Sequence, residues 1–161
     1  MAIIKTLVFT LLLPGVFLVL VPYLLLSWFG DGFTMDIGRF RYFGVLPVLL
    51  GVLTYIQCAW SFVSLGKGTP APVEPPKELV VQGLYKHVRN PMYLGVLFLL
   101  MGEAIFFASI LIFLYTALMF FCFHIFVVVY EEPNLRARFG DLYTKYRDSV
   151  PRWIPRWRKT R

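Results

Sequence analysis

Charge is scarce in this sequence, and several long stretches have none. Only 16% of the 161 residues are charged, while 58% are hydrophobic. No charged residue occurs from Leu7 to Phe29 or from Tyr42 to Leu65, and from Pro91 to Tyr130 the only one is Glu103. Such a composition is too apolar for an ordinary soluble domain. We therefore expect an integral membrane protein.

The charge-free stretches predict four membrane-spanning helices. A helix needs about 20 apolar residues to cross the hydrocarbon core of a bilayer. The first two stretches provide one crossing each, and the third, with 40 residues, is long enough for two at about 1.5 Å rise per residue. We expect spans at about 4–28, 42–65, 91–107 and 110–131. The predicted fold class is an all-α, polytopic membrane protein with four transmembrane helices.

Cysteine is also scarce, and the patterns of several functional classes are missing. Cys58 and Cys122 both fall inside predicted spans, so they do not indicate a disulfide framework. No cysteine and histidine spacing suggests a metal site, and there is no phosphate loop or dinucleotide fingerprint. The first apolar run is longer than the core of a secretory signal, and no small-residue cleavage site follows it cleanly. We therefore interpret that run as a span.

Basic residues gather in two places and predict the orientation of the chain. Segment 66–90 carries four lysines and arginines, and the tail after Glu132 carries nine. Such segments favour the cytoplasmic side, so with four spans both termini are expected there. Arg39 and Arg41 oppose this assignment weakly, because they would face outward. The basic tail is expected to attract anionic lipid headgroups, and nucleic-acid binding is not expected.

Two segments between and after the spans have their own patterns. Segment 66–90 contains four prolines, which forbid a continuous helix. A connection of this length usually binds something, although a solvated linker is the alternative. Asn90 and Pro91 are predicted to be the N-cap and first residue of the third span. Apolar residues at helical spacing over 134–148 predict a C-terminal amphipathic helix, which would lie along the membrane interface or cap the bundle.

A hairpin of the last two spans would bring residues 90–93 beside Glu131 and Glu132. Carboxylates at a helix C-terminus oppose the helix dipole, so a ligand with cationic or hydroxyl groups would stabilise them. The alternative is that Pro133 begins a new helix and that both acids lie at its N-terminus in water. His124 lies two turns before the pair inside a span, where polar residues are often functional. Glu103, near the far end of its span, is expected to be paired or interfacial.

Four sequence pieces, taken in order, resemble the isoprenylcysteine carboxyl methyltransferase and phospholipid methyltransferase superfamily of membrane enzymes. They read Gly-Leu-Tyr-Lys-His-Val-Arg-Asn-Pro-Met-Tyr-Leu-Gly (83–95), Tyr-Glu-Glu-Pro-Asn-Leu (130–135), Phe-Gly-Asp-Leu-Tyr-Thr-Lys-Tyr (139–146) and Val-Pro-Arg-Trp-Ile-Pro (150–155). Each piece alone is modestly specific. Their order, with a helical hairpin between the first two, is highly specific.

The resemblance implies an S-adenosylmethionine-dependent enzyme that methylates a lipophilic, membrane-borne acceptor. It implies cofactor-binding roles for Gly66, Gly68, Lys77, Glu78, Leu79, Val80, Tyr85, Asn90, Pro91, Met92, Tyr93 and Glu131. The expected catalytic residues are Glu131, Glu132 and His124, and no metal is expected. Prenylcysteine enzymes of the superfamily usually carry histidine at the position of Asn90, and they carry an arginine at the position of Val127 to hold the substrate carboxylate. The sequence therefore favours an amine or another lipid headgroup over a prenylcysteine carboxylate.

The chain is predicted to be a single membrane domain, 1–161. Residues 1–65 would supply two anchoring spans, and residues 66–161 would form the catalytic half. One alternative is a non-catalytic membrane assembly protein that keeps the same fold. A transporter ranks lowest, because transport requires polar residues distributed through the spans and the first two spans offer few.

Overall fold

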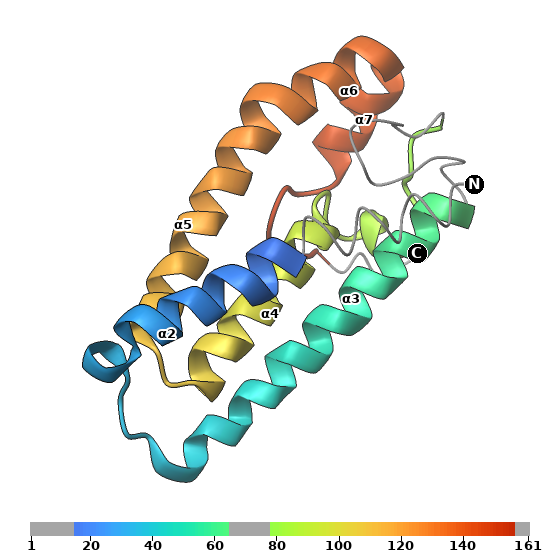
Figure 1. Cartoon of the computed structure of the whole chain (residues 1–161). Coiled ribbons are helices and arrows are strands. Elements are labelled where there is room, and N and C mark those ends of the chain that lie inside the picture. The colour runs from blue at the N-terminus through green and yellow to red at the C-terminus, as the bar shows by residue number, and fades with distance from the viewer. Residues whose placement is uncertain (1–14, 65–77, 157–161) are drawn as a thin grey trace.

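The computed structural model describes residues 15–64 and 78–156, which form a bundle of helices (Figure 1). The elements are η1 (Val16–Leu20), α2 (Val21–Phe33), η2 (Gly38–Gly44), α3 (Val45–Ser64), η3 (Gly83–Lys86), α4 (Pro91–Phe106), α5 (Ile110–Phe126), η4 (Val127–Glu131), α6 (Glu132–Phe139) and α7 (Asp141–Ser149). Within the described ranges there is no strand, only an isolated bridge between Thr34 and Ser109. The all-α prediction is confirmed.

Two helices of the described chain are long and apolar enough to cross a membrane: Gly38–Ser61 and Ile110–Phe139. Val16–Gly30 and Pro91–Phe106 are apolar but shorter. The 16 residues of α4 span about 24 Å at about 1.5 Å rise per residue, somewhat less than a hydrocarbon core of about 30 Å. The predicted first span begins outside the described residues. The count of four crossings therefore stays a prediction.

Glycines bring α3 and α4 into close backbone contact. A Cβ atom added to Gly51 would lie 2.6 Å from the Gly95 carbonyl oxygen, and one added to Gly102 would lie 2.6 Å from the Gly44 carbonyl oxygen. Gly44, which ends η2, is seven residues before Gly51 of α3, and Gly95 is seven residues before Gly102 of α4, so the two glycines of each pair lie on one face. Association of helices in lipid depends on such close packing, because lipid tails are as apolar as the side chains. These glycines align the antiparallel pair α3 and α4, the most extensive helix interface in the structure.

The predicted hairpin of the last two spans is confirmed, with a tight turn at Phe107–Ser109 between α4 and α5. Ala108 adopts a positive φ of 49° in this turn. The Ser109 side chain caps α5 by accepting a hydrogen bond of 3.4 Å from the Ile112 backbone N–H. The turn holds the two helices antiparallel, so the first residues of α4 lie at the same end of the bundle as the region after α5 (Figure 1).

The chain after α5 differs from the sequence prediction in two ways. The helix does not stop at Glu131, because the π-helical turn η4 carries the backbone directly into α6. Pro133 has no N–H and crowds the preceding turn, and the wider π turn accommodates it. The predicted single helix over 134–148 is instead two helices, α6 and α7, separated by Gly140 with φ 54°. This left-handed conformation suits glycine and turns α7 back over the bundle.

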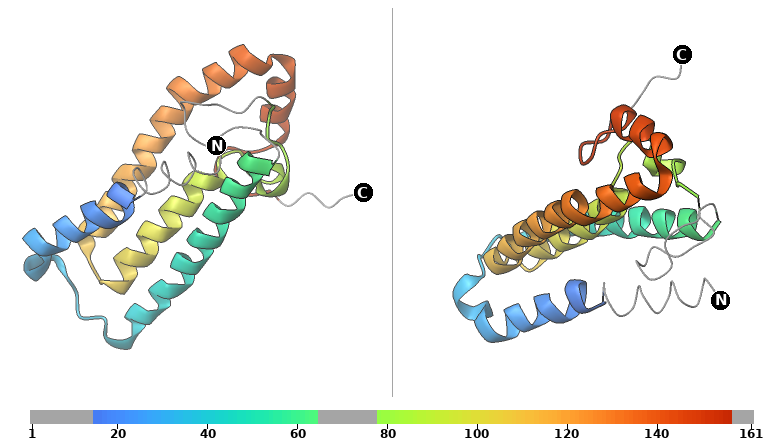
Figure 2. Two further views of the ribbon diagram at one scale, coloured as in Figure 1. Left: turned by 45° about the vertical axis from the view of Figure 1, so that its right-hand side comes forward. Right: turned by 90° about the horizontal axis from the view of Figure 1, so that it is seen from above.

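The overall arrangement has three levels when seen from above. Figure 2 shows α2 on one side of the layer of α3, α4 and α5, and α7 on the other side. The segment after α7 runs down beside the hairpin (Figure 1). The candidate site lies where this segment, residues 78–93 and the end of α5 meet.

Candidate functional site

A hydrogen bond joins the start of α4 to the end of η4. The Tyr93 hydroxyl donates to Oε2 of Glu131 at 2.8 Å. Both side chains are partly buried. The expectation that residues 90–93 and 131–132 are neighbours is therefore confirmed.

Two further elements approach Glu131. Tyr85, from η3, is buried with 7% exposure, and its hydroxyl interacts both with the Cys58 thiol of α3 and, electrostatically, with Glu131. Burial, the largest effect, raises the pKa of Tyr85 well above its ordinary value, so the phenol is neutral. Cys58 is a free thiol, as is Cys122. Glu131 thus lies among neutral hydroxyl groups, in a place where a cationic group would be stabilised.

Glu132 has a different environment from its neighbour. Oε1 accepts 2.9 Å and 2.6 Å hydrogen bonds from Arg89 and Arg152, and Oε2 accepts a second bond from Arg152 at 3.0 Å. These bonds raise the pKa of Arg152 above its ordinary value. Arg89 also donates to the Tyr143 hydroxyl of α7 at 3.4 Å. Glu132 is therefore the anionic centre of a cross-link between segments distant in sequence.

The segment after α7, residues 150–156, which we call the strap, runs along residues 87–90. The Arg89 N–H donates to the Pro151 carbonyl at 2.9 Å, and the Arg156 N–H donates to the His87 carbonyl at 3.0 Å. Asn90 is at the N-cap position, as predicted, but its side chain does not cap the helix. It donates instead to the Arg152 carbonyl at 3.2 Å. The strap thus occupies the entrance of α4.

Trp153 of the strap reaches His124 on α5. Its indole Nε1–H donates to Nδ1 of His124 at 3.0 Å. In this arrangement Nδ1 is the acceptor, so the neutral imidazole carries its proton on Nε2. The Trp153 ring also contacts Phe120, with a centroid separation of 5.3 Å, and Tyr93, at 6.5 Å. His124 is therefore held by Trp153, and within the described part of the chain no hydrogen bond joins it to Tyr93 or Glu131.

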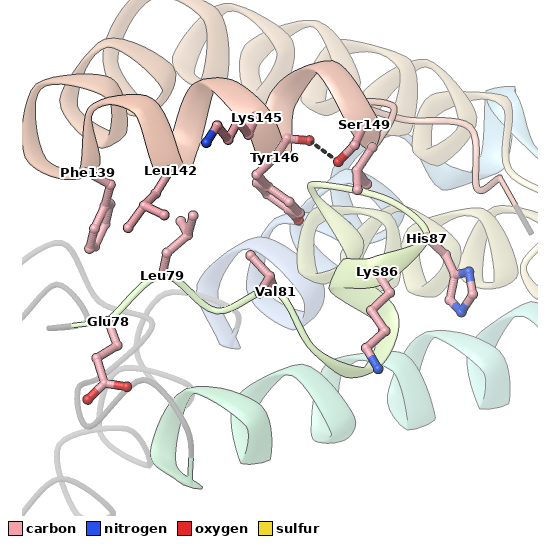
Figure 3. A pocket seen from close by; sticks show the side chains of 11 residues that line it. Glu78, Leu79, Val81, Lys86, His87, Phe139, Leu142, Lys145, Tyr146 and Ser149 are labelled. Carbon is pink, nitrogen blue, oxygen red and sulfur yellow. Dashed lines mark hydrogen bonds between the residues drawn. The ribbon is translucent and has the colours of Figure 1, made fainter. Parts of the chain in front are cut away.

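A cavity of about 920 Å³ lies between α7 and the chain leading into η3. Leu142 and Tyr146 of α7 face Leu79 and Val81 of this chain across it (Figure 3). The other lining residues are Glu78, Lys86, His87, Phe139, Lys145, Ser149 and Val150. Its walls are mainly apolar, with charged groups at the margins. A cavity of this size and character is typical of small-molecule sites.

Tyr146 connects this cavity to the surroundings of Glu131. Its hydroxyl donates to the Tyr85 carbonyl at 2.8 Å, and burial raises the pKa of Tyr146. The Tyr85 side chain in turn lies near Glu131. The apolar face predicted for the C-terminal helix therefore covers a cavity of the protein itself.

The residues predicted to bind a cofactor fall into three groups. Gly66, Gly68 and Lys77 lie outside the described residues. Glu78 and Leu79 line the cavity. In the third group only Tyr93 and Tyr85 interact with Glu131. Val80 and Met92 pack in one cluster with Tyr85, and Asn90 and Pro91 lie at the start of α4, where Asn90 binds the strap.

Three residues that sequence reasoning did not assign to the site are central to its geometry. They are Arg89, Arg152 and Trp153. Two adjacent carboxylates in a partly buried position require cations, and from the sequence we expected a ligand to supply them. The same signal also fits arginines near the pair. It did not indicate which ones. Glu103, by contrast, lies near the far end of α4, and its Oε2 is buried without a hydrogen-bond partner among the described residues.

The apolar helices indicate an integral membrane protein of the helical class, and comparison with known proteins identifies the family. Residues 40–142, more than half of the chain, match the family model for phospholipid methyltransferases. The chain belongs to the phospholipid methyltransferase family. It is also 34% identical over 77 residues to protein-S-isoprenylcysteine O-methyltransferase from Schizosaccharomyces pombe. That match covers 48% of this chain and 33% of the relative, so it spans a third of the relative's length.

Proposed function

We propose that this protein is a methyltransferase that moves a methyl group from S-adenosylmethionine to a lipophilic acceptor carried in the bilayer. The observation that carries the proposal is the partly buried Glu131 carboxylate, bound by Tyr93 at the mouth of the α4 and α5 hairpin. It lies within the region that matches the family model. A large cavity opens on the side of α7, and the hydrogen-bonded residues Tyr146 and Tyr85 connect it to the surroundings of Glu131.

The residues present suit this methyl donor. Leu79, Leu142 and Phe139 offer apolar surface for a purine ring. Glu78 provides a carboxylate that suits ribose hydroxyls or the ammonium group, while Lys145 suits the donor's carboxylate. Glu131 lies on the other side of the Tyr85 and Tyr146 pair from the cavity. Its negative charge would stabilise the donor's sulfonium. The family resemblance adds Gly66, Gly68 and Lys77 to this set.

Methyl transfer requires mainly that the protein positions the donor and the acceptor. A bound sulfonium donor supplies a methyl group whose carbon–sulfur bond breaks as the acceptor's lone pair forms the new bond, leaving a neutral thioether. An amine acceptor also releases a proton, which Glu131 is placed to accept. Alignment and electrostatic stabilisation supply most of the rate in such a transfer. Tyr93 keeps Glu131 oriented through its hydrogen bond.

An amine or another lipid headgroup is the acceptor that this site favours. Val127, one helical turn before Glu131, is buried with 1% exposure and offers no charge to hold a substrate carboxylate. The nearby arginines Arg89 and Arg152 are already engaged by Glu132. A protonated amine would instead be drawn to Glu131. The relative in Schizosaccharomyces pombe bears the name of a prenylcysteine enzyme, so the two acceptor classes must be compared directly.

The membrane arrangement that fits this function has four crossings, with residues 1–65 as anchor and 66–161 as catalytic half. Both termini and the site would then face the cytoplasm, where the soluble donor is available. The acceptor would arrive sideways from the bilayer between helices. Exposed basic residues of α6, such as Arg136 and Arg138, would contact anionic headgroups.

Two measurements test the proposal. Purified protein in detergent is titrated with S-adenosylmethionine, and saturable binding is expected. Failure to bind while the helical circular dichroism is intact would exclude the enzyme and favour a non-catalytic assembly role. Protein in vesicles is then given methyl-labelled donor with a total lipid extract or with N-acetyl-S-farnesylcysteine. Label is expected in the amine lipid fraction, and label only in the farnesylated compound would overturn the acceptor assignment.

A further inference from the structure

The strap joins every part of the site, although it belongs to no helix. It begins at Val150, which lines the cavity, and three residues later Trp153 lies between α4 and α5. Between them Arg152 binds Glu132 through two hydrogen bonds. A segment with this many specific contacts is held in one position. It therefore links the wall of the cavity to the helical hairpin.

Trp153 packs against both helices of the hairpin, α4 and α5. Its ring contacts Tyr93 of α4 on one side and Phe120 and His124 of α5 on the other. The bond to His124 fixes the orientation of the indole. Tyr93 is also the donor to Glu131, so the Trp153 ring borders the place where the methyl acceptor is proposed to bind.

We infer that Trp153 determines which acceptors are methylated, by limiting the space beside Tyr93 and Glu131. The inference rests on the proposed function and adds a specificity residue to it. A headgroup that reaches Glu131 from the bilayer meets the indole, which His124 and the strap hold in place. Small amine headgroups fit beside it, and bulkier ones collide. An apolar wall of this kind discriminates single methyl groups by about 10-fold or more.

His124 has a defined part in this arrangement. Because its Nδ1 lone pair accepts the Trp153 N–H, it is a positioning residue that acts through Trp153. Replacing it removes the acceptor and lets the indole move, while the carboxylate of Glu131 stays in place. A general base would behave differently, since its removal slows transfer to every acceptor alike.

The test compares Trp153→Leu, Trp153→Phe and His124→Phe with the unaltered protein in vesicles. Each receives methyl-labelled S-adenosylmethionine and an equal mixture of phosphatidylethanolamine and its N,N-dimethyl derivative. The measured quantity is the label transferred to the N,N-dimethyl lipid divided by the label transferred to phosphatidylethanolamine. This ratio is expected to rise about 10-fold in Trp153→Leu, with smaller rises in Trp153→Phe and His124→Phe. Donor affinity is expected to stay unchanged in all three. Trp28→Leu, at an exposed position on α2, is the matched control and should keep the original ratio.

The outcomes separate this inference from the proposed function. If the unaltered protein transfers label and the acceptor ratio is the same in all variants, Trp153 sets no specificity and the inference is wrong. A uniform loss in His124→Phe with an unchanged ratio would assign His124 to proton transfer and also contradict it. If the unaltered protein methylates neither acceptor nor any other lipid, the proposed function is wrong, and the inference that rests on it is wrong as well. Should Trp153→Leu not fold, the ratio in Trp153→Phe decides.

Discussion

The hydroxyl of Tyr93 lies 2.8 Å from Oε2 of Glu131, although the two residues are 38 positions apart. The neighbouring carboxylate, Glu132, has no part in this bond and is held by Arg89 and Arg152. Two adjacent acids thus have separate partners. One remains available to a ligand, and the other holds the structure together.

Removal of the Glu131 charge is expected to weaken donor binding. Glu131→Gln keeps the shape and a hydrogen-bond acceptor for Tyr93, but it loses the attraction for a sulfonium or ammonium group. We expect at least a 10-fold rise in the dissociation constant for S-adenosylmethionine, equivalent to about 1.4 kcal/mol. Isothermal titration measures it. Glu103→Gln, at the far end of α4, should bind as the unaltered protein does, and equal effects of both changes would mean that the site is wrongly placed.

Loss of the Tyr93 hydroxyl is expected to slow methyl transfer. Tyr93→Phe retains the ring, which packs on Phe123 with a centroid separation of 4.8 Å, but leaves Glu131 without its donor. A hydrogen bond to a charged group contributes about 1.5–3 kcal/mol, so the rate should fall roughly 10- to 100-fold at saturating donor. Tyr42→Phe, at an exposed position, is the control. An unchanged rate in Tyr93→Phe would show that the bond has no catalytic role.

Replacement of Glu132 is expected to destabilise the fold. Glu132→Gln leaves Arg89 and Arg152 without their counter-charge, and the Glu132 side chain is only 15% exposed. We expect a loss of about 2 kcal/mol in the free energy of unfolding, measured by denaturant titration in detergent. Asp148→Asn breaks a more exposed ion pair with Arg147 and should change stability little. Equal stability of both variants would contradict the cross-linking role of Glu132.

The glycine contacts between α3 and α4 predict a steric effect. In Gly51→Ala the new methyl group would lie 2.6 Å from the Gly95 carbonyl oxygen, so the helices must move apart. Overpacking of this kind costs about 1–3 kcal/mol, which a thermal unfolding scan detects. Gly30→Ala is the matched control, because a Cβ there meets nothing within 4 Å, and alanine favours a helix. Gly30→Ala should therefore be neutral or slightly stabilising.

The four-span arrangement predicts which ends of the chain are accessible from outside. Single cysteines are introduced at Lys5, Asp36 and Lys159, after Cys58 and Cys122 have been replaced by alanine. A membrane-impermeant maleimide applied to intact cells should label only the cysteine at position 36. Labelling at position 5 or 159 would require a different number of crossings or the opposite orientation.

Much of the fold could be predicted because apolar runs and helix boundaries are local properties. The start of α4 at Pro91 and the turn before Ile110 were predicted to within a residue or two, and the hairpin then required residues 90–93 to lie beside Glu131. The continuation of the helix through Pro133 was not predicted. Proline normally ends or bends a helix, but here a π turn, which has no sequence signature of its own, precedes it, and Pro133 lies in the first turn of α6, where a proline is tolerated.

The sequence by itself determined that the chain is helical, apolar and built around a hairpin, since these features follow from composition and periodicity along the chain. Only the tertiary structure decided which carboxylate is available and which is neutralised. It also placed Trp153 against His124 and Gly51 against Gly95. The physical reason is that these partners come from segments far apart in sequence, where no local pattern specifies which side chains meet. The hairpin made it predictable that residues 90–93 lie beside Glu131 and Glu132, and the structure showed that Tyr93 is the residue that bonds to Glu131.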